Sequence, residues 1–203
     1  MKDMYWSHLP HHVAGSEFQN AKPEDNNRIE TKSNRIYYYC EVSRGRNLTL
    51  NMKLKELAGD LIDRSRSLQV DPGNIYLHIN SYGGSVFAGF SSVDYILNSE
   101  VPVTSIIDGC AASAATIMSV TAKHRQINKH AYMLIHQLSS GMWGKYQEQQ
   151  DSMENNDRLM KMIVDIYEEH TKIPKKELNK LLKHDLWWDA ETCLKYGLVD
   201  EII

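Results

Sequence analysis

One serine in this chain lies in a setting that favours nucleophilic chemistry. Ser113 is the hydroxyl within the small-residue run 109–115, Gly-Cys-Ala-Ala-Ser-Ala-Ala, which separates an extended apolar segment at 101–107 from an apolar helix beginning at Thr116. Small neighbours leave a hydroxyl open to a substrate, and the first turn of a helix has unpaired N–H groups that can hold negative charge. The pattern predicts a nucleophile for acyl transfer. A serine that merely caps the helix is the simpler alternative.

Two titratable residues elsewhere have the chemistry that such a serine needs. His136 follows an apolar strand predicted at 132–135 and opens an exposed loop, so a ring that titrates near neutral pH lies at a strand end. Such a ring can take a proton from a serine and return it to a leaving amine. Asp185 lies between a predicted helix and two tryptophans, where a partly shielded carboxylate can orient an imidazole. Taken singly, an edge histidine and a helix-end carboxylate are the structural alternatives.

A glycine pair could complete such a site. Gly83 and Gly84 follow a short strand predicted at 75–79, and strand ends of α/β sheets are where ligands bind. Without side chains, this turn can present a backbone N–H to an open site. A simple tight turn is the alternative. Cys110 is a second possible nucleophile, but no base is placed for it.

Strand-like and helical patterns alternate along the chain from Arg35. This alternation predicts an α/β fold with βαβ crossovers. His124 and His130 are expected to flank a solvent-facing hairpin. The predicted strands are 36–42, 75–79, 101–107, 132–135 and 198–203, and the predicted helices are 50–68, 86–98, the segment from 116, a long one at 145–170, 175–183 and 189–197.

Composition limits the class of protein. With 203 residues, 42% of them hydrophobic, the chain is long enough for one domain with a core. A net charge of -3 without a basic stripe argues against nucleic-acid binding, and no apolar run reaches membrane-spanning length. Three distant cysteines favour a reducing compartment, and without a secretory signal we expect the cytoplasm, or an organelle matrix or stroma. Without a phosphate-binding loop the chain is not expected to hydrolyse ATP itself.

Residues 1–34 are polar and are predicted to form a flexible N-terminal arm, with the domain covering 35–203. His8, His11 and His12 could bind a metal ion, but no cysteine or carboxylate cluster supports them, so no resident metal is expected.

Four segments together resemble the proteolytic subunits of the Clp proteases, in the Clp/crotonase-like superfamily of serine peptidases. They are Ile-Asn-Ser-Tyr-Gly-Gly-Ser at 79–85, Gly-Cys-Ala-Ala-Ser at 109–113, Met-Leu-Ile-His-Gln at 133–137, and Asp185 followed by Tyr-Gly-Leu-Val-Asp at 196–200. They occur in the family's order with similar spacing, and the resemblance covers about residues 35–203.

The resemblance implies a ββα-spiral head domain with a long handle helix at about 145–170, assembled as two stacked heptameric rings around a closed chamber. It implies a Ser113–His136–Asp185 triad and an oxyanion hole made by the N–H groups of Gly84 and Ala114. An extended peptide would add as a strand between the backbone near residues 83–86 and that near residues 137–139. The substrate-binding residues implied are Gly83, Ser85, Val86, Gln137 and Leu138.

The same resemblance implies unfolded proteins and peptides as substrates, no cofactor in this chain, and a separate AAA+ unfoldase that uses the ATP. Some features depart from the family pattern: Tyr82 replaces the usual proline before the glycine pair, the serine-to-histidine spacing is slightly short, and residues 1–34 do not match the pore-lining arm. These departures suggest a divergent phage- or organelle-type member. A catalytically inactive ring subunit and a crotonase-type acyl-CoA enzyme remain alternatives.

Overall fold

The computed structural model describes residues 29–203 except Met142. Strand β1 (Ile29–Lys32) pairs antiparallel with β2 (Arg35–Tyr38). The last residues of the predicted arm therefore form an edge strand of the sheet, ahead of the predicted domain start at Arg35. The rest of that arm, with its three histidines, lies outside the described residues.

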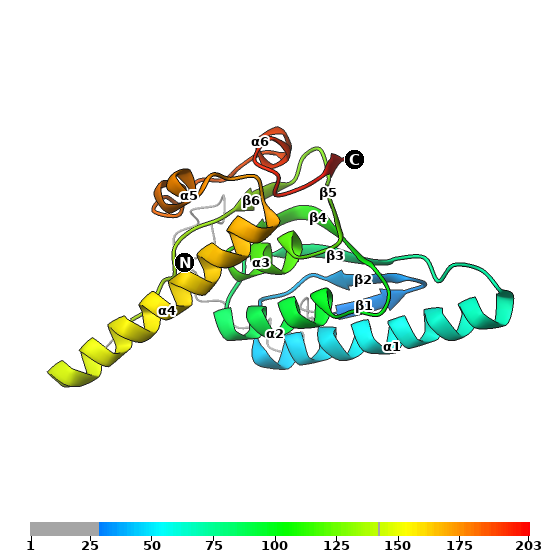
Figure 1. Cartoon of the computed structure of the whole chain (residues 1–203), viewed down its shortest axis with the longest axis horizontal. Helices are drawn as coiled ribbons and strands as arrows, with labels where there is room; N and C mark the ends of the chain where they lie inside the picture. The colour runs from blue at the N-terminus through cyan, green and yellow to red at the C-terminus, as the bar shows by residue number, and fades with distance from the viewer. Residues whose placement is uncertain (1–28, 142) are drawn as a thin grey trace, which may run out of the picture.

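The described residues form a seven-stranded sheet at the centre of the molecule (Figure 1). Its order is β1-β2-β3-β4-β5-β7, and β6 pairs with β4 outside this path. Every pair except β1–β2 is parallel, and parallel neighbours require crossover connections. The predicted α/β fold is therefore confirmed. The remaining strands are β3 (Ile75–Ser81), β4 (Val103–Ala112), β5 (His124–Ile127), β6 (Tyr132–Leu134) and β7 (Glu201–Ile202).

The predicted hairpin between His124 and His130 is wrong. His124 begins β5, which runs parallel to β4 within the sheet. The strand reads His-Arg-Gln-Ile and has a single apolar residue, Ile127, which is also its only buried one. The segment therefore lacks the apolar pattern that identifies a strand in sequence.

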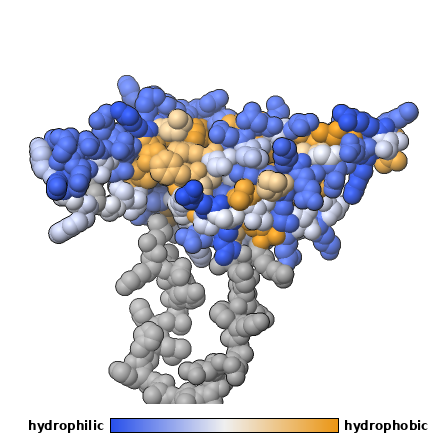
Figure 2. All heavy atoms as spheres, turned by 90° about the horizontal axis from the view of Figure 1, so that it is seen from below, coloured by the Kyte–Doolittle hydropathy of each residue, from blue (hydrophilic) through white to orange (hydrophobic). Residues whose placement is uncertain are grey.

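The helices α1 and α2 run beneath the sheet in Figure 1. The helix α4 projects away from the sheet, and its outer end, at the left of Figure 2, is covered with hydrophilic residues. None of the described helices is long and apolar enough to cross a membrane. The helices are α1 (Arg44–Leu68), α2 (Val86–Leu97), α3 (Ala114–Val120), α4 (Tyr146–His170), α5 (Lys175–Leu181) and α6 (Ala190–Lys195).

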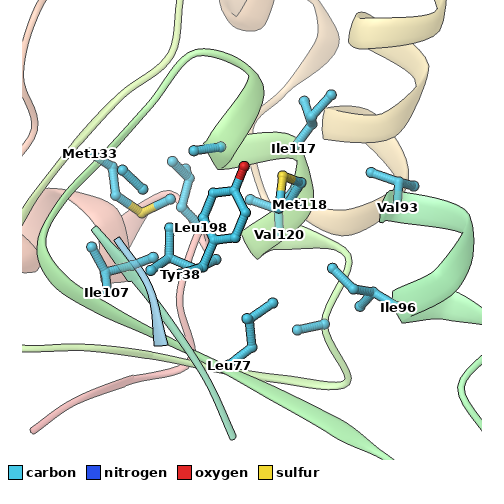
Figure 3. Close-up of a cluster of buried hydrophobic side chains, with 14 of the residues drawn as sticks. Tyr38, Leu77, Val93, Ile96, Ile107, Ile117, Met118, Val120, Met133 and Leu198 are labelled. Carbon is cyan, nitrogen blue, oxygen red and sulfur yellow. The ribbon is translucent and has the colours of Figure 1, made fainter. Parts of the chain in front are cut away.

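The core lies between the sheet and these helices (Figure 3). Leu77 and Ile107 come from the sheet, Ile96 from α2, and Ile117 and Met118 from α3; all five are buried. Burying one such side chain contributes about 1.5–3 kcal/mol. The apolar run that follows Ser113 is therefore a core element, which holds the start of α3 in place.

A buried asparagine links α1 to the strand and helix beside it. The Tyr38 hydroxyl donates to Oδ1 of Asn47 at 2.7 Å, and Nδ2 of Asn47 donates to the Ala88 carbonyl at 3.0 Å and to the Ser92 hydroxyl at 2.7 Å. Asn47 is 1% exposed, so these bonds have no competition from water.

Replacing Asn47 by alanine should lower the free energy of unfolding by about 1–3 kcal/mol, because it leaves buried partners unpaired. Urea denaturation followed by circular dichroism measures the change. The neighbouring Leu48 is 61% exposed, and Leu48→Ala should change stability by no more than about 0.5 kcal/mol. Equal effects of the two changes would contradict the role given to Asn47.

Candidate active site

The pairing of β4 with β6 brings the serine and the histidine to one edge of the sheet. β4 is long and changes partner: its first half pairs with β5, and its last residues, Cys110–Ala112, pair with β6. Ala112 lies opposite Leu134, and the Ser113 N–H donates to the Leu134 carbonyl at 2.9 Å. His136 follows two residues later. The strand register therefore decides that Ser113 and His136 leave the sheet side by side.

Ser113 occupies a strained turn between β4 and α3. Its φ of 56° and ψ of -127° lie outside the regions that non-glycine residues favour, at a cost of order 1–3 kcal/mol. The Thr116 N–H and hydroxyl both donate to the Ser113 carbonyl, at 2.9 Å and 2.6 Å, and hold the turn. The Ser113 side chain makes no capping bond, so the helix-cap alternative is wrong. A strained strand–turn–helix elbow is an arrangement that exposes a nucleophilic hydroxyl.

The glycine turn lies directly against this elbow. A Cβ on Gly83 would stand 2.5 Å from the Ala112 carbonyl oxygen and 2.7 Å from Cβ of Ser113, so only glycine fits there. Within residues 29–203, no acceptor pairs with the N–H of Gly84 or of Ala114. Two unpaired backbone donors therefore flank the serine.

Asp185 reaches the histidine because its segment is held at both ends beside β6. The Gln137 N–H donates to the Leu182 carbonyl at 2.6 Å, and Met133 and Trp188 exchange a pair of backbone hydrogen bonds at 2.7 and 2.9 Å. Between these anchors, Oδ1 of Asp185 lies 3.5 Å from Nδ1 of His136. The Asp185 side chain is 68% exposed and that of His136 is 9% exposed.

This environment keeps the imidazole neutral and ready to accept a proton. Burial lowers the pKa of His136, and the charge of Asp185 partly offsets that effect. With Nδ1 facing the carboxylate, Nε2 is the acceptor atom. Nε2 is buried and has no hydrogen-bond partner in the described part of the chain, an arrangement that costs about 1–3 kcal/mol.

A cavity of about 1110 Å³ opens at this edge of the sheet and is lined by Ser113 and His136. The residues expected to bind substrate also line it: Gly83, Ser85, Val86, Gln137 and Leu138. The backbone N–H groups of four of them are already engaged within the fold. That of Gly83 donates to the Ser81 hydroxyl at 3.2 Å, and that of Leu138 is directed to Sδ of Met160 at 3.0 Å. The Ser85 N–H donates to the Val42 carbonyl at 2.8 Å, and the Gln137 N–H is bonded to Leu182.

Comparison with known proteins gives the family. The family model described as Clp protease matches residues 32–203. This chain belongs to the Clp protease family. The chain is 35% identical over 154 residues to the ATP-dependent Clp protease proteolytic subunit 1 of Chlamydia caviae, covering 72% of this chain and 80% of that protein. It is 30% identical over 131 residues to the ATP-dependent Clp protease proteolytic subunit of Deinococcus radiodurans, covering 64% of each chain.

Membership in a peptidase family leaves the crotonase-type alternative without support. The structure disfavours Cys110 as an alternative nucleophile. Its thiol is directed to Oδ1 of Asn80 at 3.5 Å, and burial raises its pKa, which disfavours the reactive thiolate. Among residues 29–203 other than Met142, no group of three or more His, Cys, Asp or Glu side chains could hold a metal ion.

Sequence reasoning missed a contact between the handle helix and the elbow. The Tyr167 hydroxyl of α4 lies 2.5 Å from Oγ1 of Thr116, which itself donates to the Ser113 carbonyl. Because the Thr116 proton is committed to that carbonyl, Tyr167 is the donor. Tyr167 is buried, and this burial raises its pKa and keeps the phenol protonated. In the sequence, Tyr167 stands out only as one residue of the apolar stripe along this helix, together with Leu159, Ile163 and Ile166.

Tyr167 and Thr116 should therefore act as positioning residues for the elbow. Both Tyr167→Phe and the isosteric Thr116→Val should lower kcat for a short fluorogenic peptide by about two- to tenfold, the equivalent of one hydrogen bond, with little change in KM. Thr116→Ser keeps the hydroxyl and should retain most of the activity. Thermal denaturation measured alongside separates positioning from folding. Loss of activity in Thr116→Ser equal to that in Thr116→Val would contradict this role.

Proposed function

We propose that this chain hydrolyses peptide bonds of peptides and unfolded proteins through an acyl-enzyme on Ser113. The observation that carries the proposal is the convergence of a strained serine, a buried histidine with a free Nε2, and a carboxylate at one cavity. Membership in the Clp protease family supports the same chemistry.

The reaction follows from the roles of these groups. Oγ of Ser113 attacks the peptide carbonyl carbon while Nε2 of His136 takes the hydroxyl proton, and Asp185 stabilises the imidazolium that forms. The carbonyl oxygen becomes an oxyanion held by the N–H groups of Gly84 and Ala114, each donor contributing roughly 3 kcal/mol. The C–N bond then breaks, and His136 gives its proton to the leaving amine. Water, deprotonated by His136, hydrolyses the ester and frees Ser113.

The Ser113 hydroxyl must donate to Nε2 of His136 when substrate is bound. This bond would satisfy the buried atom that has no partner in the structure. Catalytic hydrogen bonds often tighten only in the substrate complex, so its absence here is compatible with the mechanism.

We also propose that the chain works as two stacked heptameric rings, with a separate AAA+ ATPase that unfolds and feeds the substrate. The relatives from Chlamydia caviae and Deinococcus radiodurans are named as ATP-dependent, whereas this chain has no phosphate-binding loop. The projection of α4 from the head supports a role in joining two rings (Figure 1). Sizing of the purified protein, followed by negative-stain imaging, tests the assembly.

A fluorophosphonate probe tests the nucleophile. Wild-type protein should be labelled at Ser113 and should cleave short peptides, whereas Ser113→Ala should lose both properties and still assemble. Peptide mapping by mass spectrometry identifies the labelled residue. An unlabelled wild-type protein that assembles into rings would instead support the inactive-subunit alternative.

The dependence of activity on pH tests the base. Because His136 must be neutral to accept a proton, kcat/KM should fall as pH drops through its pKa, which lies below the ordinary value of about 6.5. Asp185 raises that pKa, so Asp185→Asn should lower kcat and move the acidic limb to lower pH.

Initial rates between about pH 4.5 and 8 measure this limb. Glu191→Gln is the matched control, because it removes one negative charge from an exposed position on α6 and should leave the limb where it is. A limb that moves to higher pH in Asp185→Asn, or a flat profile in the wild type, would exclude the assigned roles.

A further inference from the structure

The order of the strands places a second carboxylate at the catalytic edge. β2, β3, β4 and β6 are successive parallel neighbours, and the residues beyond their carboxyl ends include Glu41, Gly84, Ser113 and His136 in that order. Neighbouring strands lie about 4.8 Å apart, so Glu41 stands roughly 10 Å from the serine, on the side away from the histidine.

The segment carrying Glu41 is fixed to the glycine turn by backbone hydrogen bonds. The Val42 N–H donates to the Gly83 carbonyl, and the Ser85 N–H donates to the Val42 carbonyl, both at 2.8 Å. Cγ of Glu41 lies 3.1 Å from the position that a Cβ on Gly84 would occupy. The Glu41 side chain therefore lies beside Gly84, whose N–H is one of the proposed oxyanion donors.

The charge of Glu41 is not balanced inside the cavity. Among the described residues that line it, Glu41 is the one with a carboxylate, and no lysine or arginine is present. Arg44 and Arg46 are close in sequence but do not line the cavity. No ion pair within residues 29–203 involves Glu41, and Asp185 adds a second negative charge beside His136.

The part of the cavity formed by α4 is suited to apolar substrate side chains rather than to cations. The wall furnished by α4 includes Leu159, Ile163 and Tyr167, and Leu138 lies with them among the lining residues. An extended peptide places successive side chains on alternate faces, so one peptide can present an apolar side chain to this wall and a cation to Glu41.

We propose that Glu41 is a specificity-determining residue that selects peptides with lysine or arginine close to the scissile bond. This inference rests on the proposed peptidase function. The carboxylate pairs with the ammonium or guanidinium group of a substrate side chain that passes over Gly84. Because Glu41 is solvent-exposed, we expect a preference of about two- to fivefold in kcat/KM, the range typical of exposed ion pairs.

Internally quenched peptides that differ only by arginine or citrulline test this inference, because citrulline has nearly the same shape without the charge. The pair is compared at each of the three positions on either side of the scissile bond. At one of these positions or more, wild-type protein should cleave the arginine peptide faster. Glu41→Gln should bring the ratio of arginine to citrulline rates close to one. Glu56→Gln, an exposed change on α1 away from the cavity, should leave the ratio as in the wild type.

The salt dependence of the wild-type ratio is a second readout that needs no variant. Screening should reduce the ratio as ionic strength rises from about 0.05 to 0.5 M. Equal rates for the two peptides at every position, or an unchanged ratio in Glu41→Gln, would overturn the inference while leaving the peptidase function intact. Failure to cleave either peptide, together with an unlabelled Ser113, would instead overturn the proposed function itself.

Discussion

The pairing of the last residues of β4 with β6 is the constraint on which the rest of the site depends. The pairing of Ala112 with Leu134 sets where β4 and β6 each leave the sheet. The hydrogen bond from the Ser113 N–H to the Leu134 carbonyl continues the ladder by one step. A shift of one residue would turn side chains to the opposite face of the sheet. The serine and the histidine would then no longer open into the same cavity.

The other parts of the site are attached to this edge by backbone contacts rather than by flexible side chains. The glycine turn after β3 is packed against the elbow so closely that a side chain at Gly83 would collide with it. The segment bearing Asp185 is fixed at Leu182 and Trp188. Backbone anchors of this kind hold reacting groups in place before substrate arrives, which reduces the reorganisation needed during the reaction.

The helix α4 has two roles in this arrangement. Its outer part projects from the head with a hydrophilic surface. Its inner part lines the cavity and is linked through Tyr167 and Thr116 to the carbonyl of Ser113. A change in the position of α4 would therefore be felt at Ser113. This link gives a physical route by which contacts made by α4 could affect the geometry of Ser113.

The sequence alone was sufficient for the α/β class, for most helices and strands, and for the family, because apolar periodicity and short motifs are local signals. It missed β1 and β5, whose residues are mostly polar and become strands through pairing with a neighbour. It identified Ser113, His136 and Asp185 as candidates but not their distances. Only the tertiary structure decided that Glu41, Thr116 and Tyr167 belong to the same site, because strand order and helix packing join residues that no spacing in the sequence connects.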